Sequence, residues 1–456
     1  MGSTVGATLR ELRPGYVMSK VYFIGIKGVG MTALACCYQD SGWDVAGSDT
    51  GEVFITDAVL NERQIKISPL DVPVPTSSNL VIYSTAYAAP QVSCRAIPLA
   101  VAVAEFVASK KLIAVSGVGG KTTTSAMLAA LFHQVGRDVG YYVGTGSIAG
   151  LAAPGHAGSD PYFVVEADEY AVSKSDNRAK MNLLTPDILV TTNIVHDHPD
   201  IYRDEQATDK AFAELVSRIR PGGSWICNPE DPGTARLLDL QACLPDRQGL
   251  SLKGIKVIHY TATMPQLDLA VFGLQNQLDA RAAVLAAVES GVSKSQAVAG
   301  IKAYRGAGRR QEFFGQVADR LLYDDYGHHP SEIKVTINSF REHFPGRRII
   351  LVFESHTYSR TEALLAEFGA AVASADLTFI MPIFESAREK NTPHTALVEL
   401  LAKEAGKYNP SVKVVTWQNA PEQVVSASLP GDVILTMGAG MVYKLHPEIA
   451  KYLTRI

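Results

Sequence analysis

The sequence predicts an α/β protein with three domains built on largely parallel sheets. Strand-like and helix-like segments alternate along almost the whole chain. Its 456 residues exceed what one hydrophobic core usually organises. Tight glycine loops also follow several apolar strands. We expect an N-terminal domain over residues 1–110, a central domain over 111–318 and a C-terminal domain over 319–456.

The composition is that of an ordinary globular protein, with 47% hydrophobic and 19% charged residues. A net charge of −4 argues against a nucleic-acid binder held by a bulk basic surface. Neither a long apolar run nor a secretion-type N-terminus is found, so we expect no membrane association. The odd, scattered set of five cysteines predicts reduced, buried thiols and a cytoplasmic location.

Residues 113–124, Ile-Ala-Val-Ser-Gly-Val-Gly-Gly-Lys-Thr-Thr-Thr, form the most informative segment. A short strand, a glycine turn and a helix start present backbone N–H groups and a partial positive charge to one anion. Lys121 adds a full charge suited to a β- or γ-phosphate, and Thr122 offers a hydroxyl to Mg²⁺. Val115 stands where the common phosphate loop has glycine, so a structural glycine turn is the alternative.

The N-terminal block reads as a strand, a glycine loop, a helix to about residue 40 and a second strand that leads to Asp49. Another strand, over 80–83, ends at Ser84. The glycines of the loop are spaced G-x-x-G-x-G, which differs from dinucleotide binders. We interpret the loop as a nucleotide-phosphate site with Asp49 near a ribose or base. A purely structural Rossmann-like turn is equally compatible.

Further polar residues follow strands of the central block. Glu166 ends an apolar strand that we expect beside the phosphate-loop strand, where its carboxylate can complete an Mg²⁺ site with Thr122. A plain salt bridge is the alternative. His198 falls just beyond the same sheet edge, which favours a ligand or phosphate contact, whereas His196 is read as structural.

Two segments near the second domain boundary carry more polar groups. Arg310 lies at a position from which it could contact a phosphoryl group. The alternative is that Arg309 and Arg310 are an ordinary pair of solvent-exposed arginines. The segment 324–330, Asp-Asp-Tyr-Gly-His-His-Pro, is rich in groups that bind sugars, metals or phosphates. The two adjacent histidines could indicate a zinc site, but no cysteine or further histidine lies at a suitable spacing. A nucleotide contact is therefore favoured.

Together these motifs resemble the Mur ligase family, the cytoplasmic enzymes that build the peptide stem of peptidoglycan. Five motifs match in order over almost the whole chain. The resemblance implies a Rossmann-like UDP-binding domain, a central P-loop-type ATPase domain with a mainly parallel sheet, and a Rossmann-like C-terminal domain. It implies an ATP-dependent ligase that joins L-alanine to the lactyl carboxylate of UDP-N-acetylmuramate through an acyl phosphate.

The resemblance also assigns roles to residues. Those implied to be catalytic are Lys121, His198 and Arg310. Those implied to bind ATP are Gly117, Gly119, Gly120, Lys121, Thr122, Thr123, Asn276, Arg310 and Asp325. Thr122 and Glu166 would hold one Mg²⁺, and His198 would help hold a second. Those implied to bind the UDP-sugar are Gly28, Gly30, Met31, Asp49 and Ser84. Those implied to approach the amino acid are His356, Arg360 and Arg388.

Two branches of the family compete for the function. Segments 356–361 and 383–389 look like the third domain of the branch that adds L-alanine. Residues 176–180 instead resemble the murein peptide ligases, which attach a recycled tripeptide to the same nucleotide sugar. We give the third domain more weight, because the amine is chosen there. A non-catalytic regulator that binds UDP-sugar and ATP is a rival from another class, and a homodimer is one expected assembly.

The chain departs from this branch at several positions. Val118 and Gly119 replace the usual threonine and histidine of the phosphate loop. Gln275 and Asp279 replace the usual histidine and asparagine around Asn276. A Glu-Ser pair at 354–355 replaces the usual Gln-Pro. These changes leave the phosphate and metal set in place, but they bear on affinity and on the identity of the acceptor.

Overall fold

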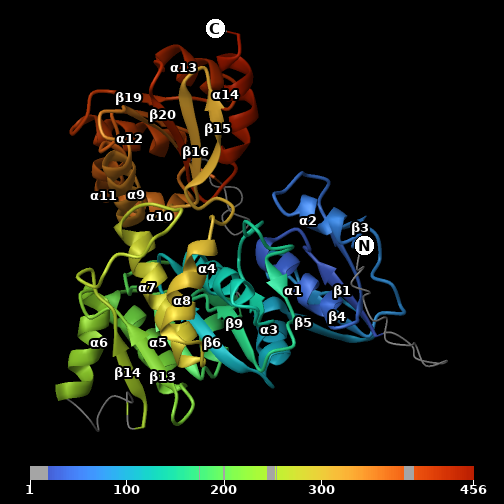
Figure 1. The fold of residues 1–456 in the computed structure, drawn as a ribbon. Coiled ribbons are helices and arrows are strands. Elements are labelled where there is room, and N and C mark those ends of the chain that lie inside the picture. The colour runs from blue at the N-terminus through green and yellow to red at the C-terminus, as the bar shows by residue number, and fades with distance from the viewer. Residues whose placement is uncertain are drawn as a thin grey trace, which may run out of the picture.

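The computed structural model describes residues 19–455 except 174, 199–200, 244–251, 253 and 385–394. Three α/β units follow one another along the chain, each with its own sheet (Figure 1). The N-terminal unit (blue) lies beside the central unit (cyan to yellow), and the C-terminal unit (orange to red) lies on another side of the central one. The predicted α/β class with mainly parallel sheets is confirmed.

The first sheet has five parallel strands in the order β3-β2-β1-β4-β5. The strand order reverses between β1 and β4, and ligands of open α/β sheets bind outside the carboxyl ends of such strands. The glycine loop follows β1 and Ser84 follows β4, so both lie at this point. The strands are β1 Lys20–Ile24, β2 Asp44–Asp49, β3 Lys66–Pro69, β4 Leu80–Tyr83 and β5 Arg95–Pro98. The helices are α1 Val29–Asp40, α2 Asp57–Glu62 and α3 Leu99–Val107.

The central sheet has seven strands in the order β14-β13-β12-β6-β9-β7-β8, all parallel except for the β7–β8 pair. The phosphate-loop strand β6 lies between β12 and β9, and its apolar residues are buried because helices cover both faces. Its strands are β6 Lys111–Ser116, β7 Gly140–Tyr142, β8 Gly155–His156, β9 Tyr162–Glu166, β12 Ile188–Thr191, β13 Ser224–Cys227 and β14 Lys256–His259. A hairpin is formed by β10 Ala171–Ser173 and β11 Asp176–Ala179. The helices are α4 Lys121–Gln134, η1 Lys180–Leu183, α5 Glu205–Ser217, α6 Pro232–Cys243, α7 Leu274–Glu289, α8 Lys294–Gly300 and η2 Ile301–Ala303.

The third sheet has six strands in the order β15-β16-β20-β17-β18-β19, with β15 antiparallel at one edge. Its strands are β15 Glu312–Val317, β16 Arg320–Asp325, β17 Ile349–Phe353, β18 Leu377–Ile380, β19 Val412–Val414 and β20 Val433–Met437. The helices are α9 Pro330–His343, α10 Tyr358–Ala363, α11 Leu365–Val372, α12 Thr395–Gly406, α13 Ala420–Ala427, η3 Val442–Leu445 and α14 His446–Leu453.

One strand lies on the other side of the predicted boundary at 318/319. β15 pairs with β16 through a hairpin, so residues 312–317 belong to the third sheet and not to the central domain. The short edge strand is half exposed and has no continuous apolar run, which is why its pattern did not reveal its partner.

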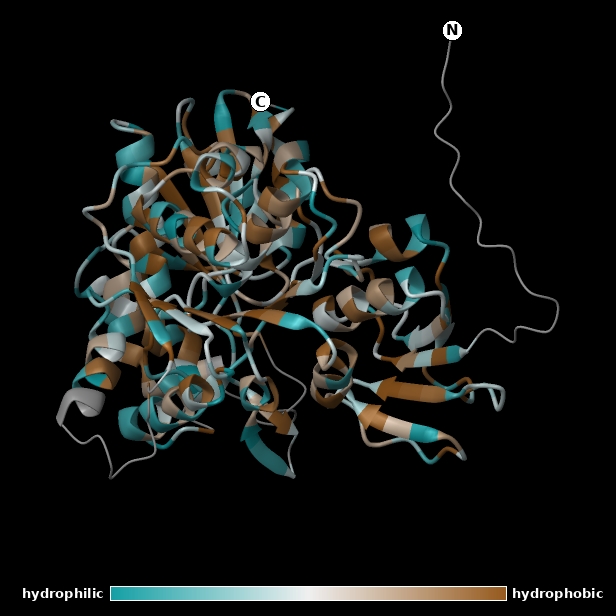
Figure 2. Ribbon diagram, turned by 60° about the horizontal axis from the view of Figure 1, so that its bottom comes forward, coloured by the Kyte–Doolittle hydropathy of each residue, from teal (hydrophilic) through white to brown (hydrophobic). Residues whose placement is uncertain are grey.

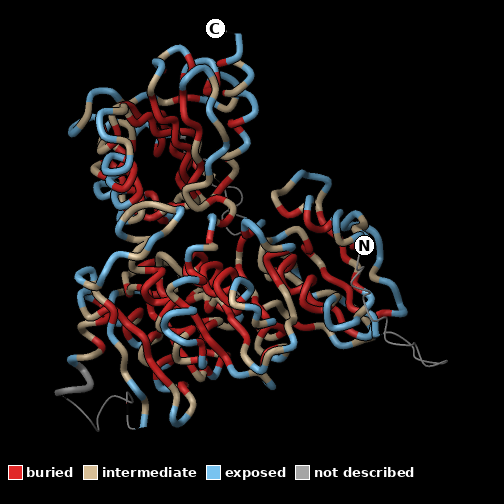
Figure 3. The backbone as a smooth tube through the Cα atoms, viewed as in Figure 1, coloured by how far each residue is buried: buried red, intermediate tan, exposed pale blue. Residues whose placement is uncertain are grey.

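The apolar residues concentrate in the strands and on the inner faces of the helices (Figure 2). The buried backbone accordingly follows the three sheets (Figure 3). The four cysteines with described side chains are free thiols, as predicted; Cys36, Cys37 and Cys227 are buried and Cys94 is half-buried. Among the described residues, no helix combines the length and apolar character needed to cross a bilayer.

Candidate active site

The phosphate loop connects β6 to the start of α4. Gly120 takes a left-handed conformation with φ 85° just before the helix, and the first turn has no side-chain cap, so its N–H groups face outward. Asn193, at the end of β12, shapes the loop. Its Oδ1 accepts from the backbone N–H of Val118 at 3.1 Å and of Gly119 at 3.0 Å. Sequence reasoning did not give Asn193 a role, although its place after a buried strand marks it.

Glu166 lies beside the phosphate loop, as predicted. β9 pairs with β6 in a register that sets Glu166 opposite Val115. The carboxylate accepts from Thr122 Oγ1 at 2.8 Å through Oε1 and from the backbone N–H of Gly144 at 2.7 Å through Oε2. Thr122 is buried at the first turn of α4, so a hydroxyl and a carboxylate oxygen meet at the end of the loop.

The ammonium of Lys121 is held inside the site. Nζ lies 2.8 Å from Oε2 of Glu169 and donates to the carbonyl oxygens of Gly117 at 2.6 Å and Val118 at 3.0 Å. Burial lowers the pKa of Lys121, but the charges of Glu169 and Asp168 outweigh it, so the net pKa is raised and the side chain is charged. Glu169 was not among the predicted site residues, although it lies three positions after Glu166.

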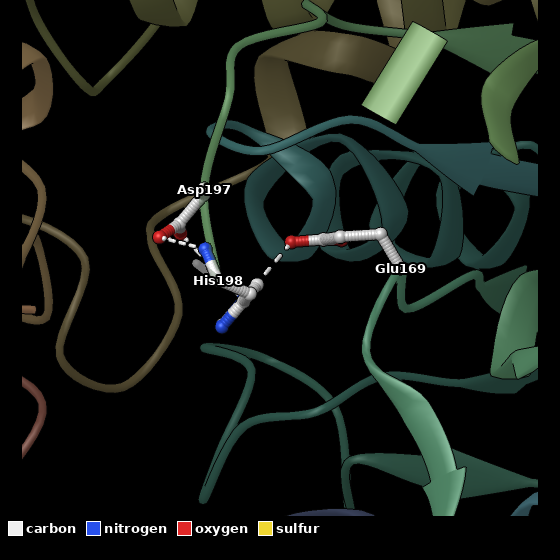
Figure 4. A group of neighbouring side chains, drawn as sticks. All are labelled: Glu169, Asp197 and His198. Carbon is white, nitrogen blue, oxygen red and sulfur yellow. Dashed lines mark hydrogen bonds and ion pairs between the residues drawn. The ribbon is translucent and has the colours of Figure 1, made fainter. Parts of the chain in front are cut away.

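His198 lies between two carboxylates, Glu169 and Asp197 (Figure 4). Its Nε2 is 3.6 Å from an oxygen of each. Burial lowers the pKa of His198, but the hydrogen bond to Glu169 and the charge of Asp197 outweigh it and raise the pKa. One ligand atom from each residue lies within 4.8 Å of the others, which is close enough to share a cation. Asp197, which directly precedes His198, is a further site residue to which the sequence assigned no role.

Two arginines bring the third domain onto this cluster. Arg310, in the linker before β15, donates from Nη2 to Thr122 Oγ1 at 2.9 Å. Arg360, in α10, donates from Nη2 to Asp197 Oδ1 at 2.8 Å and to His198 Nδ1 at 3.1 Å. The other ring nitrogen, Nε2, faces Glu169. Arg360, which the resemblance assigns to the amino acid, thus contacts the predicted metal ligand His198 and also lines the large cavity described below.

A cavity of about 770 Å³ joins residues from all three domains. Several predicted site residues line it: Gly30, Ser84, Gly120, Lys121, Thr122, Glu166, His198, Arg310, His356 and Arg360. A second cavity of about 230 Å³ lies on the other side of the phosphate loop. The predicted residues that line it are Gly119, Gly120, Thr123, Asn276, Arg310 and Asp325.

Side chains of the second cavity bind one another across the linker. Asn276 Nδ2 donates to the carbonyl oxygen of Phe272 at 2.7 Å and to Oε1 of Gln311 at 2.9 Å. The Asp325 carboxylate accepts from the backbone N–H groups of Gln311 and Gly327, and burial raises its pKa to about 6. Burial also raises the pKa of Asp279, beneath Gly120, to about 8.

Of the predicted residues that the structure describes, four line neither cavity: Gly28, Met31, Asp49 and Gly117. The carboxylate of Asp49 is turned onto its own domain, where it accepts from the backbone N–H of Lys27 at 2.7 Å and of Thr50 at 2.7 Å. It therefore supports the loop after β1. A Cβ on Gly117 would lie 2.0 Å from Thr192 Oγ1, so this glycine allows β6 and β12 to approach closely.

Of the three residues assigned to the amino acid, the structure describes His356 and Arg360. His356 lines the large cavity, and its ring stacks on Phe384 with centroids 5.5 Å apart. Arg388 lies outside the described residues.

The donors of the site suit a hard cation. Glu166 and Thr122 offer oxygens at one point, and Glu169, Asp197 and His198 offer two oxygens and a nitrogen at another. Carboxylate and hydroxyl oxygens are the ligands that Mg²⁺ prefers, whereas an imidazole also suits transition metals. Lys121 and Arg310 add positive charge, so the site can hold an anion together with its cations.

Comparison with known proteins gives the same family for segments of all three units. The model described as "Mur ligase family, catalytic domain" matches residues 20–110, "Mur ligase middle domain" matches 115–245, and "Mur ligase, glutamate ligase domain" matches 309–440. The UDP-N-acetylmuramate–L-alanine ligase of Desulfitobacterium hafniense (strain Y51) is 33% identical over 453 residues, which cover 93% of this chain and 98% of the relative.

Two solved structures have the same fold. The UDP-N-acetylmuramate–alanine ligase of Thermotoga maritima superposes with a TM-score of 0.72 at 20% identity, covering 96% of this chain and 100% of that one. The murein peptide ligase of Psychrobacter arcticus 273-4 superposes with a TM-score of 0.68 at 22% identity, covering 96% of this chain and 99% of that one. With relatives matched over nearly their full length and three family models in order along the sequence, this chain belongs to the Mur ligase family.

Proposed function

We propose that this protein is an ATP-dependent ligase that joins L-alanine to the lactyl carboxylate of UDP-N-acetylmuramate. One observation carries the proposal: a single cavity joins the glycine loop of the first domain, the phosphate loop of the second and the α10 region of the third. Three substrates, each held by a different domain, require such a common space. The relative with 33% identity bears the name of this activity.

The phosphate loop supports the binding of ATP. The open N–H groups at the start of α4 and the ammonium of Lys121 offer positive charge to the β- and γ-phosphates. Arg310 donates to Thr122 Oγ1 at 2.9 Å, which supports a role for its guanidinium at the γ-phosphate. Asn276 and Asp325 in the smaller cavity would contact the nucleoside.

Magnesium would be held at two places, by Thr122 with Glu166 and by His198 with Glu169 and Asp197. The bound ions would neutralise the charge of the terminal phosphates and of the reacting carboxylate. Glu166 and Glu169 already bind their neighbours in this arrangement, so the oxygens are oriented before any ligand arrives.

The proposed reaction proceeds in two transfers. A lactyl carboxylate oxygen attacks the γ-phosphorus of ATP, ADP leaves, and an acyl phosphate forms. The amino group of L-alanine then attacks the acyl carbon, loses a proton and displaces inorganic phosphate. A carboxylate is a poor electrophile in water, so activation must precede attack by the amine. Lys121 and Arg310 would stabilise the charge of the first transfer, and closure of the three domains would exclude water.

The first domain supports the nucleotide sugar. Gly30 and Ser84 line the cavity at the strand reversal of the first sheet, where α1 begins. Gly28 and Met31 would form the rest of this loop, and Asp49 would hold its shape through Lys27. On the opposite side of the cavity, His356 and Arg360 would approach the amino acid, with Arg388 as predicted from the sequence.

The proposal is tested with purified protein, UDP-N-acetylmuramate, ATP, magnesium and an equal mixture of alanine, glycine, serine and tripeptide. Mass spectrometry of the nucleotide products should show the alanine adduct together with ADP. ADP release that needs no amine, or the absence of any amide product, would reject the proposal and favour a regulator that binds the same ligands.

A murein peptide ligase is the second candidate, and one observation favours it. Residues 176–180 lead from hairpin strand β11 into η1, and Lys180 lines the large cavity with Nζ 2.7 Å from Asp168 Oδ2. This positive side chain could receive an acidic peptide. The same mixture decides between the two, because this candidate predicts the tripeptide adduct. Assembly as a homodimer stays a prediction, which light scattering would test.

A further inference from the structure

The linker between the central and third domains changes its attachment at one peptide bond. Up to Gly308 it is bound to the central domain: the Gly308 N–H donates to the carbonyl oxygen of Ser147 at 2.9 Å, and Thr145 Oγ1 donates to the Gly308 carbonyl oxygen at 3.2 Å. From Arg309 onward the backbone hydrogen bonds reach the third domain, apart from that of the Arg310 N–H, which donates to the carbonyl oxygen of Ala307 at 3.1 Å. The Tyr326 N–H donates to the Arg309 carbonyl oxygen at 2.7 Å.

The side chain of Arg309 is buried in the third domain, with 4% of the residue exposed. Nε donates to Asp324 Oδ2 at 2.8 Å, Nη1 donates to the carbonyl oxygen of Gly440 at 2.8 Å, and Nη2 donates to the carbonyl oxygen of Gly438. The guanidinium also lies 4.6 Å from the ring centroid of Tyr443. Its planar fork thereby joins the ends of β16 and β20.

The next residue points the opposite way. Arg310 crosses to the central domain and donates to Thr122 Oγ1 at 2.9 Å. Both guanidinium groups lie near the ring of Tyr326, Arg309 at 5.2 Å and Arg310 at 4.9 Å from its centroid. Arg309 has φ 61°, and Gln311 has φ 48°, conformations that non-glycine residues seldom take without support. The backbone N–H groups of Arg309 and Gln311 bind Glu312 and Asp325, which provide that support.

We propose that Arg309 is a positioning residue: by fastening the linker to the ends of β16 and β20, it makes Arg310 move with the third domain and reach Thr122 in this arrangement of the domains. The inference rests on the proposed function, because it takes Arg310 as the phosphate-facing group. Arg309 itself contacts none of the residues that line the phosphate loop among its described partners. Its influence on turnover therefore passes through Arg310.

Arg309→Lys tests this, because lysine keeps the charge but cannot bind Asp324 and two carbonyl groups at once. Arg320→Lys is the matched control. Arg320 is 6% exposed, starts the same strand β16, and donates to the carbonyl oxygens of Ala318 and Ser428 at the end far from the site. Calorimetry should show comparable losses of thermal stability for both variants, which separates folding from positioning.

The decisive measurement is a double-mutant cycle with Arg310→Ala. We expect Arg309→Lys to lower kcat by about tenfold or more with KM for ATP changed less than about threefold. In the Arg310→Ala background the same substitution should lower kcat by less than about twofold. Equal losses in both backgrounds, or a loss no larger than that of Arg320→Lys, would overturn the inference. An unimpaired Arg310→Ala variant would overturn it as well while leaving the ligase function intact.

A second readout does not depend on turnover. Small-angle scattering with magnesium and a non-hydrolysable ATP analogue should give a larger radius of gyration for Arg309→Lys than for the unsubstituted protein and for Arg320→Lys. Identical curves for all three proteins would contradict the role of Arg309 in fixing the domains. If the unsubstituted protein makes no amide, the proposed function fails, and this measurement still decides whether Arg309 holds the linker.

Discussion

The guanidinium of Arg360 lies against the carboxylate of Asp197, with 2.8 Å between Nη2 and Oδ1. Arg360 belongs to α10 of the third domain and Asp197 follows β12 of the central domain, and each side chain is 4% exposed. The positive charges of His198 and Arg360 outweigh burial and hold the pKa of Asp197 below its usual range. A buried ion pair therefore joins the domain proposed to bind ATP to the domain proposed to bind the amine.

Replacing Arg360 should reduce turnover more than stability. In Arg360→Met, the buried carboxylate of Asp197 loses its ion pair with the third domain. Because an unpaired buried charge is unfavourable, the two domains should tend to separate. We expect kcat to fall by about 10- to 100-fold, measured by ADP release. Arg348→Met is the control, because Arg348 pairs with Asp432 at 2.6 Å within the third domain. Equal activity of the two variants would argue against a role for the cross-domain pair.

The pH dependence of stability should reveal Asp279. Burial raises its pKa from 3.8 to about 8, against smaller opposing effects of Thr124, Gln275 and Arg310. A carboxyl group with a raised folded pKa stabilises the fold at low pH, and this contribution is lost as the pH rises towards the folded pKa. Asp279→Asn should therefore gain roughly 1–3 kcal/mol over the unsubstituted protein between pH 5.5 and 8.5. Calorimetry across this range is the measurement, and a difference that does not vary with pH would contradict it.

A histidine clamp joins the first and central domains and should respond in the same sense. His156 binds Asp40 through Nδ1 and Asp138 through Nε2, each at 2.7 Å, and Arg63 also pairs with Asp40. The hydrogen bond to Asp40 is the largest cause of the raised pKa of His156, and burial opposes it. The stabilisation is complete below the unfolded pKa of about 6.5 and is lost as the pH rises through the higher folded value.

His156→Gln should therefore cost more stability at pH 6 than at pH 9. The difference should be about 1 kcal/mol or less, because the side chains of His156, Asp40 and Asp138 are 34%, 20% and 55% exposed and water screens them. Thermal unfolding at the two pH values provides the comparison. Equal destabilisation at both would show that the protonated clamp contributes nothing.

Lys121 should matter for rate while the fold persists. Lys121→Ala removes the charge assigned to the terminal phosphates, and we expect a loss of about 10²- to 10³-fold in kcat. Lys110→Ala is the control, since Lys110 also donates to two backbone carbonyl oxygens, those of Gly158 and Asp160, away from both cavities. Circular dichroism would verify the fold. Near-normal activity of Lys121→Ala would remove this residue from the mechanism.

Local sequence patterns predicted those site residues that lie at the end of a strand or in the loop that follows it. The phosphate loop, Glu166 at the end of β9 and His198 after β12 all lie at one edge of the central sheet, because parallel strands end there. The register of β6 and β9 alone sets Glu166 beside Val115, and this brings its carboxylate to Thr122.

Side-chain contacts between separate elements could not be predicted from these local patterns. Nothing in the local pattern indicates that Lys121 pairs with Glu169, because that depends on the turn between β9 and β10. The Arg360–Asp197 pair depends on how two domains meet, 163 positions apart in the chain. Asp49 was expected near a ribose or base, which stays a prediction; the pattern did not indicate that its carboxylate accepts from two backbone N–H groups of its own domain.

The proposed function depends on the transfer of a phosphoryl group from ATP to the lactyl carboxylate. Unsubstituted protein should be given UDP-N-acetylmuramate with both lactyl carboxylate oxygens replaced by ¹⁸O, together with ATP, magnesium and L-alanine. Mass spectrometry should then find one ¹⁸O atom in each inorganic phosphate released, because the oxygen that attacks the γ-phosphorus leaves with the phosphate. Phosphate without label, formed alongside the amide product, would contradict this account.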